Sequence, residues 1–238
     1  MTLQQPEQPA SSLDSISTQW TALQDPAQFA ERYGLAVRNY LERLLRNCDD
    51  AEDITQEFLV QVVQQGFAGA KQERGKFRHY LKVAVRRAAL DFLRKRRSMR
   101  RGQERLAEHL AAAPAMVPDE HWLEDYRQCL LMSVWQRLRR HQDSTPGNLF
   151  HRVLQAAVDQ PDADSRILAT QISQETGKML TAEAFRQQLH RARRLFASFL
   201  VEEVSRTVEP ADRQHVDEEL AELGLLEFVA KSVPRCGC

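Results

Sequence analysis

Apolar residues recur at every third or fourth position through much of the chain, which is the spacing of one face of an α-helix. Between Pro26 and about Gln65 two such stripes follow each other, and a polar break at 47–50 separates them. This pattern predicts a helical hairpin. The apolar positions are Phe29, Tyr33, Val37, Leu41 and Leu44 in the first helix and Ile54, Phe58, Leu59, Val62 and Val63 in the second.

A third stripe predicts a helix from about Lys76 to Arg97, after Gly66 and Gly69 have ended the second. At 100° per residue its apolar residues share one side of the helix. They are Phe77, Leu81, Ala84, Val85, Ala88 and Phe92.

The next stretch, 98–118, is charged and then rich in alanine with two prolines, so we expect a partly helical linker. A second domain starts near Asp119 with a helix that the polar turn 143–147 stops, and a short helix spans 149–158. The first of these helices carries Trp122, Tyr126, Leu130, Leu131, Val134, Trp135 and Leu138 at helical spacing.

The segments 165–175 and 181–203 both have helical periodicity, and the turn 176–180 between them contains Gly177. This layout is typical of a helix-turn-helix. On the second helix Phe185, Leu189, Ala192, Phe196 and Phe199 share the apolar side. The tail adds one further amphipathic stretch, 216–229.

Few glycines and prolines and many Leu, Ala, Arg, Gln and Glu residues favour helices over sheets. The fold class we expect is all-α, with two small helical domains joined by a linker. The boundaries are a flexible N-terminal lead at 1–19, a first domain at 20–97, the linker at 98–118, a second domain at 119–207 and a C-terminal extension at 208–238.

Positive charge is concentrated in the third helix. Between Arg74 and Arg101 the chain has twelve Lys or Arg residues and one acid, Asp91, although its total charge is zero. Like charges three or four residues apart destabilise a helix unless a partner relieves them. A nucleic acid is the expected partner, because attraction to phosphate requires clustered charge. The alternative is an ordinary solvated helix face, for which so many uncompensated charges are too many.

The second helix of the helix-turn-helix directs Arg186, Gln187, His190 and Arg194 away from its apolar side. Arg and Gln near a helix N-terminus suit the major groove, where Arg reads guanine edges and Gln reads adenine. Thr181 is placed to cap this helix. The alternative is a polar exterior on a core helix.

An acidic face lies on the second helix of the hairpin, where Asp50, Asp53 and Glu57 cluster with Gln56 and Gln64. No histidine accompanies these carboxylates, and the chain has no glycine-rich phosphate loop, so we expect no enzyme activity. A docking face for a basic protein partner is the favoured interpretation, and a solvated face is the alternative.

The four cysteines, Cys48, Cys129, Cys236 and Cys238, form neither a paired framework nor a zinc-binding pattern. We therefore expect no metal and no cofactor. The chain has no run of eighteen apolar residues and no basic flank before an apolar run at its start. A cytoplasmic protein without a membrane segment is expected.

Three motifs resemble one family. The run DAEDITQEFL at 50–59 resembles the second-region helix of sigma-70 family RNA polymerase sigma factors, extracytoplasmic-function (ECF) branch. The run FRHYLKVAVRRAALDFLRKRR at 77–97 resembles the family's promoter-melting helix, with Tyr80 where Trp is usual and Arg87 where Asn is usual. Residues 167–170 with AFRQQLHRAR at 184–193 resemble its fourth-region helix-turn-helix, and the tail is similar to that of planctomycete-type members.

The resemblance implies a promoter-specificity subunit that binds core RNA polymerase and promoter DNA, with an anti-sigma factor as a possible further partner. Binding to the clamp of the largest subunit is implied for Asp50, Asp53, Gln56 and Glu57. Contact with the −10 element is implied for Arg74, Lys76, Arg78, Tyr80, Lys82, Arg86, Arg87, Arg94, Lys95 and Arg97. Contact with the −35 element is implied for Thr181, Arg186, Gln187, His190, Arg191 and Arg194.

Two other functions remain open from the sequence. A stand-alone helix-turn-helix transcriptional regulator explains the basic patches but gives the acidic helix no role. A helical RNA-binding or adaptor protein uses the basic helix for shape-based phosphate contact.

Overall fold

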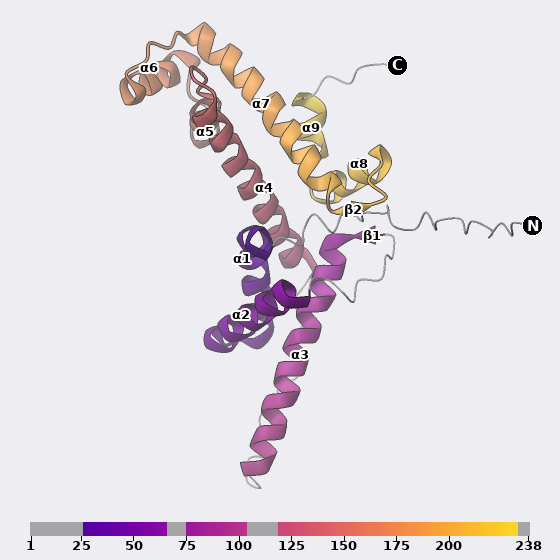
Figure 1. Cartoon of the computed structure of the whole chain (residues 1–238). Coiled ribbons are helices and arrows are strands. Elements are labelled where there is room, and N and C mark those ends of the chain that lie inside the picture. Colours follow the sequence, from indigo (N-terminus) through magenta and orange to yellow (C-terminus); the bar gives the residue numbers. More distant parts are fainter. Residues whose placement is uncertain (1–25, 66–74, 104–118, 233–238) are drawn as a thin grey trace, which may run out of the picture.

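The computed structural model of the chain describes residues 26–65, 75–103 and 119–232 (Figure 1). The expected N-terminal lead, Arg74, most of the expected linker and the Cys236 and Cys238 pair lie outside these residues. So do the glycines that we expected to end the second helix.

The described residues are almost entirely helical, as expected. The helices are α1 (Pro26–Leu45), α2 (Cys48–Gln65), α3 (Phe77–Gln103), α4 (Asp119–Ser144), α5 (Phe150–Asp159), α6 (Ser165–Thr176), α7 (Ala182–Ser205), α8 (Arg213–Glu222) and α9 (Leu226–Ser232). Two short strands, β1 (Gly75–Lys76) and β2 (Val208–Glu209), were not predicted.

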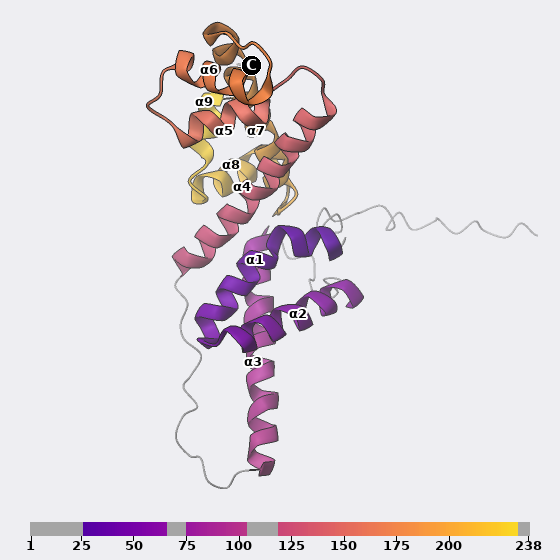
Figure 2. The same ribbon diagram turned by 90° about the vertical axis from the view of Figure 1, so that its left-hand side faces the viewer.

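Helices α1 and α2 form the predicted hairpin and pack on the first half of α3 (Figure 2). The side chain of Asn47 accepts a hydrogen bond from the Asp50 backbone N–H at 3.1 Å, which satisfies a free donor in the first turn of α2. The stripe of α1 is fully buried, and Phe77, Leu81 and Val85 of α3 close the core from the other side.

Helices α4 and α7 pack along each other and connect the two ends of an elongated molecule. Figure 1 shows α5 and α6 at one end and α1 to α3 at the other. A small separate core holds α5 and α6 to the start of α7, and it is built from Leu149, Val153, Leu168, Ala169, Ile172 and Phe185.

The main hydrophobic core contains residues from both of the expected domains. Trp122 and Tyr126 at the start of α4 are buried against α1, where the Tyr126 ring stacks on Tyr33 with centroids 5.6 Å apart and Trp122 meets Tyr40 edge-on. The buried carboxylate of Asp125 accepts a hydrogen bond from the Asn39 side chain at 3.0 Å and also pairs with the Arg43 guanidinium. One hydrophobic cluster therefore runs from α1 through α4 to α9.

The tail is two short helices rather than the single stretch expected at 216–229. Gly224 adopts a positive φ of 68°, a conformation that glycine accepts readily and that ends α8. The residue before it, Leu223, is buried, so the break lets the apolar side chains of both α8 and α9 reach the core.

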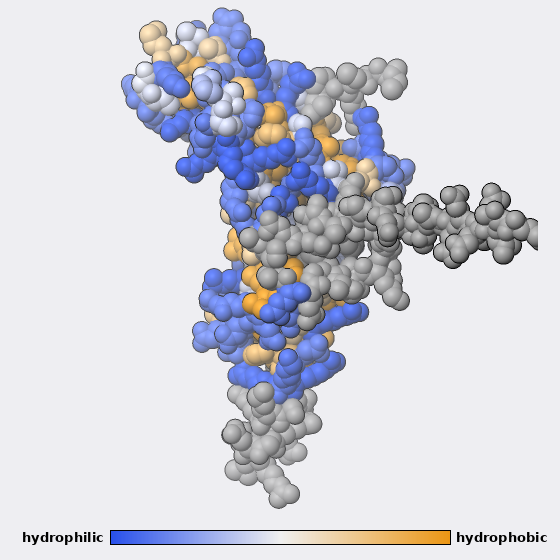
Figure 3. All heavy atoms as spheres, in the orientation of Figure 1, coloured by the Kyte–Doolittle hydropathy of each residue, from blue (hydrophilic) through white to orange (hydrophobic). Residues whose placement is uncertain are grey.

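Hydrophilic side chains cover much of the described surface visible in Figure 3, with apolar side chains between them in the middle of the molecule and at the α6 end. None of the described helices combines the length and the apolar character that crossing a lipid bilayer requires. No grouping of three or more His, Cys, Asp or Glu side chains suited to a metal ion occurs among the described residues.

Candidate nucleic-acid interface

The basic helix α3 has an open side in its middle. Arg86 and Arg87 are exposed, and neither has an ion-pair partner among the described residues. Arg94 is also exposed and pairs with Asp91 of the same helix, Nη1 to Oδ1 2.9 Å, as the helical spacing predicts. Arg97 belongs to α3, but its side chain lies outside the described part.

The cations at the beginning of α3 form ion pairs inside the fold. Arg78 is only 6% exposed, and its Nε donates to Glu219 Oε1 of α8 at 2.7 Å. Lys76 lies 3.2 Å from Glu219 Oε2 through its Nζ, and Glu222 pairs with both cations. In this conformation Lys76 and Arg78 are therefore neutralised within the fold, because a buried guanidinium requires an anion and α8 provides it. Their expected contact with the −10 element stays a prediction.

Lys82, one turn further along α3, is also occupied. Its side chain is 18% exposed and pairs with Asp119 at the start of α4. Partial burial, followed by the charge of Arg86, lowers the pKa of the Lys82 ammonium. In this conformation Lys82 is thus a bridge between α3 and α4 rather than an open phosphate contact.

His79 and Tyr80 lie in the first turn of α3. Tyr80 is half-buried, with its ring centroid 6.4 Å from that of Phe77, and burial raises the pKa of its hydroxyl. Partial burial and the neighbouring Arg78 lower the pKa of His79. At neutral pH both groups are uncharged, so the local positive charge comes from Lys and Arg side chains.

The acidic face of α2 meets the second half of α3. Asp50 pairs with Arg96, and Glu57 Oε1 lies 3.5 Å from Lys95 Nζ. Asp53 and Gln56 are exposed, and no described residue forms an ion pair with Asp53. Part of the acidic face therefore forms ion pairs with α3. Asp53 has no ion pair within the described residues.

A groove of about 310 Å³ separates α2 from α3 at this point. Apolar side chains form its floor, and the charged groups stand along its rims. It is lined by Ile54, Glu57, Phe58, Gln61, Ala88, Asp91, Phe92, Arg94 and Lys95.

A short turn joins α6 to α7, in the segment where the sequence predicts a helix-turn-helix. Gly177 ends α6 in the left-handed conformation, with φ at 67°. Thr181 caps α7, as predicted, because its Oγ1 accepts a hydrogen bond from the Ala184 N–H at 3.1 Å. Beyond the cap, a row of polar side chains is exposed along α7: Arg186, Gln187, His190, Arg191 and Arg194.

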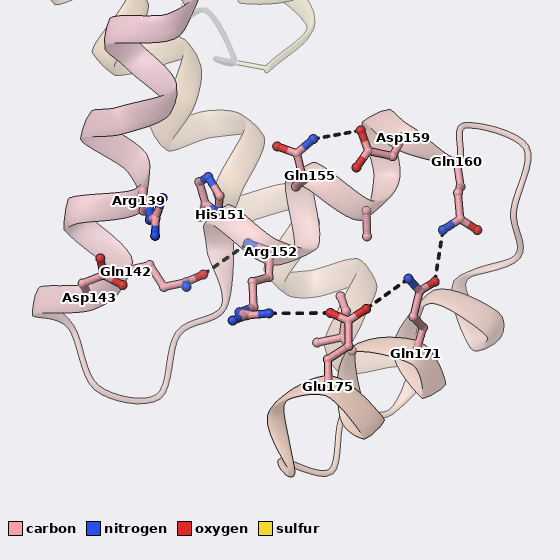
Figure 4. A pocket seen from close by; sticks show the side chains of 12 residues that line it. Arg139, Gln142, Asp143, His151, Arg152, Gln155, Asp159, Gln160, Gln171 and Glu175 are labelled. Atoms are coloured by element: carbon pink, nitrogen blue, oxygen red, sulfur yellow. Dashed lines mark hydrogen bonds and ion pairs between the residues drawn. The ribbon is translucent and has the colours of Figure 1, made fainter.

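A second hollow, of about 350 Å³, lies where α4, α5 and α6 meet (Figure 4). One ion pair is formed in it, between Arg152 Nη1 and Glu175 Oε2 at 3.6 Å. Gln160 donates to Gln171 of α6 at 3.0 Å, and Gln155 donates to Asp159 of the same helix at 2.8 Å. These mutual contacts among polar lining residues favour a solvated joint between helices over a ligand site.

The sequence interpretation missed the buried carboxylates. Asp125 and Glu219 are 5% and 1% exposed, and each neutralises a cation of the first three helices. Glu203 of α7 does the same for Arg32, Oε1 to Nη1 3.0 Å. Helical periodicity could have indicated that these three carboxylates are buried, because all three lie beside apolar residues on the buried sides of their helices.

Comparison with known proteins identifies the first part of the chain. Residues 29–99 match the family model Sigma-70 region 2, which takes in α1, α2, β1 and most of α3. No curated protein and no solved structure gives a match to the chain.

A hairpin with an acidic face, packed on a basic helix and matching this domain, defines a promoter-recognition subunit that has no enzymatic activity of its own. Such a subunit binds core RNA polymerase and directs transcription initiation. Residues 29–99 thus form a sigma-70 family domain, and this domain implies that the chain is an RNA polymerase sigma factor. The regulator and RNA-binding alternatives are therefore not supported.

The ion pairs at the start of α3 predict a pH dependence of stability. Hydrogen bonding from Lys76, opposed by partial burial, lowers the pKa of the Glu222 carboxyl. A lowered folded-state pKa stabilises the fold above the usual carboxyl range, and this contribution is lost as the pH falls through the folded value. Glu222→Gln should therefore lower the melting temperature at neutral pH, and the difference from the wild type should shrink on acidification.

Circular dichroism melts across the acidic range measure this difference. Glu218→Gln is the matched control, because Glu218 is exposed on the same helix and does not contact α3. A difference for Glu222→Gln that persists unchanged at low pH would contradict the assignment.

Proposed function

We propose that this sigma factor belongs to the ECF branch and is of the planctomycete type, with a region 4-like helix-turn-helix at 119–207 after its region 2 domain. The observation that carries the proposal is the capped helix α7, which follows a left-handed glycine turn and exposes a row of Arg, Gln and His side chains. Its order after the acidic and basic helices is that of the family.

On this proposal α7 reads the −35 element. Arg186 and Gln187 lie in the first two turns after the Thr181 cap, where a recognition helix meets base edges. Arg can bond to both acceptors of a guanine, and Gln to the N6 and N7 positions of adenine. Arg191 and Arg194 lie further along the helix and supply phosphate contacts.

Helix α3 engages the −10 element in this proposal. Arg86 and Arg87 offer exposed guanidinium groups at its centre, with no ion-pair partner in the part of the chain that the structure describes, and Arg94 extends the row. Asp91 holds the Arg94 side chain by their 2.9 Å contact, which fixes one cation of the row in place.

The clamp of the largest polymerase subunit would dock on the free part of the acidic face, Asp53 and Gln56, with Glu57 and Asp50 adding charge. The residues before α4 form the linker, and an anti-sigma factor remains a candidate regulator. The work of a sigma factor on core polymerase favours the cytoplasm as its location.

The polymerase contact is tested by capture of tagged core enzyme. Asp53→Ala combined with Glu57→Ala should weaken capture by about tenfold, because two charges at the centre of the docking face are removed. Asp143→Ala combined with Asp162→Ala removes two exposed acids, one at the end of α4 and one in the turn between α5 and α6, and should leave capture unchanged. Equal capture of both double variants, with unaltered melting curves, would count against the docking face.

The two DNA contacts are separated by their sequence dependence. With core enzyme and a promoter library in run-off transcription, Arg186→Ala should relax discrimination at one −35 position by roughly 1–3 kcal/mol. Arg87→Ala should instead weaken binding to all sequences alike and reduce the salt dependence of affinity. The same relaxation of base preference in both variants would refute this division of roles.

A further inference from the structure

The C-terminal segment 208–232 carries β2, α8 and α9 back to the start of the basic helix. Strand β2 pairs antiparallel with β1, so that Gly75 lies opposite Glu209 and Lys76 opposite Val208. The Phe77 N–H donates to the Thr207 carbonyl at 2.8 Å. The backbone at the start of this segment is thus hydrogen-bonded to the start of α3.

The same segment presents acidic side chains to this point. It contains seven acidic and two basic residues, and Glu219 and Glu222 contact Lys76 and Arg78. Glu219 is 1% exposed, so its charge is committed to these two cations. Both cations are therefore neutralised within the chain.

Apolar packing holds the segment in place. Val208, Val216, Leu220, Leu223 and Val229 are buried in the main core. Beside the segment, Trp122 joins α4 to α3, because its Nε1 donates to the Arg78 carbonyl at 3.2 Å. The acidic side chains are therefore fixed over the start of α3.

We infer that residues 208–232 form an autoinhibitory clasp. Its carboxylates occupy the start of α3, where Lys76 and Arg78 are expected to contact the −10 element, and it must leave before DNA can bind there. The inference rests on the proposed contact between α3 and promoter DNA and concerns the regulation of that site. DNA phosphates and the clasp carboxylates compete for the same cations, Lys76 and Arg78. The affinity for DNA is then reduced in proportion to the fraction of molecules that are open.

A reversible lock tests the clasp. Gly75→Cys with Glu209→Cys places two thiols on a paired strand position, where the Cα spacing of an antiparallel ladder fits a disulfide. Serine replaces Cys48, Cys236 and Cys238, while the buried Cys129 is retained. The two single cysteine variants, treated with the same oxidant, are the controls.

The oxidised double variant should bind a fluorescein-labelled DNA duplex of mixed sequence about tenfold more weakly than its reduced form, with a salt slope shallower by about 2. Run-off transcription with core enzyme should fall in parallel and recover on reduction. Equal DNA binding and transcription in both forms would overturn the clasp and leave the proposed function intact. Absence of transcription in the wild type and the reduced form alike would refute the proposed function itself.

Opening the clasp should have the opposite effect. Glu219→Gln with Glu222→Gln removes the competing carboxylates and should raise affinity for the same duplex, with a steeper salt slope. Glu218→Gln with Glu227→Gln removes the same charge from exposed positions that do not contact α3. An equal gain in both double variants would show that net charge alone is responsible and would overturn the inference.

Discussion

Arg78 must find an anion inside the folded chain, because its guanidinium is withdrawn from water at the start of α3. Glu219, 141 residues further along the sequence, is this anion and accepts a 2.7 Å hydrogen bond from the Arg78 Nε. Removing one member of a buried ion pair typically costs about 3–5 kcal/mol, since the other charge is left uncompensated. This constraint fixes α8, and with it β2 and the end of α7, against the sigma region 2 domain. The long-range order of the molecule depends on it.

The same arrangement explains how one neutral chain can hold a strongly basic helix. Carboxylates from α2, α4 and α8 meet the cations of α3 at Asp50, Asp119, Glu219 and Glu222. In the middle of the helix, Arg86 and Arg87 have no ion-pair partner among the described residues. The free protein therefore presents a smaller cationic surface than its sequence predicts, and release of the internal partners enlarges it.

Helical periodicity was sufficient to predict α1 to α7, their apolar stripes and the Thr181 cap, because these depend on neighbours within a few residues. It did not predict the break at Gly224 that divides the tail into α8 and α9. It was not sufficient for the joining of the two halves. Trp122 and Tyr126 read equally well as the core of a separate domain, and nothing local shows that they bury against Tyr40 and Tyr33. The ion pairs that Lys76 and Arg78 form with α8 were not predicted for the same reason. Their partners are distant in sequence, and a cationic helix gives the same pattern whether its charges face water or a carboxylate.

The central claim is that the start of α3 is shared between an internal clasp and DNA. Hydrogen exchange of peptides from 75–82 and 208–223, followed by mass spectrometry, tests it most directly. In the free chain both should exchange slowly, as parts of one hydrogen-bonded unit. On addition of core polymerase and promoter DNA, 208–223 should lose protection while 75–82 remains covered. Unchanged protection of 208–223 in the transcribing complex would contradict the claim.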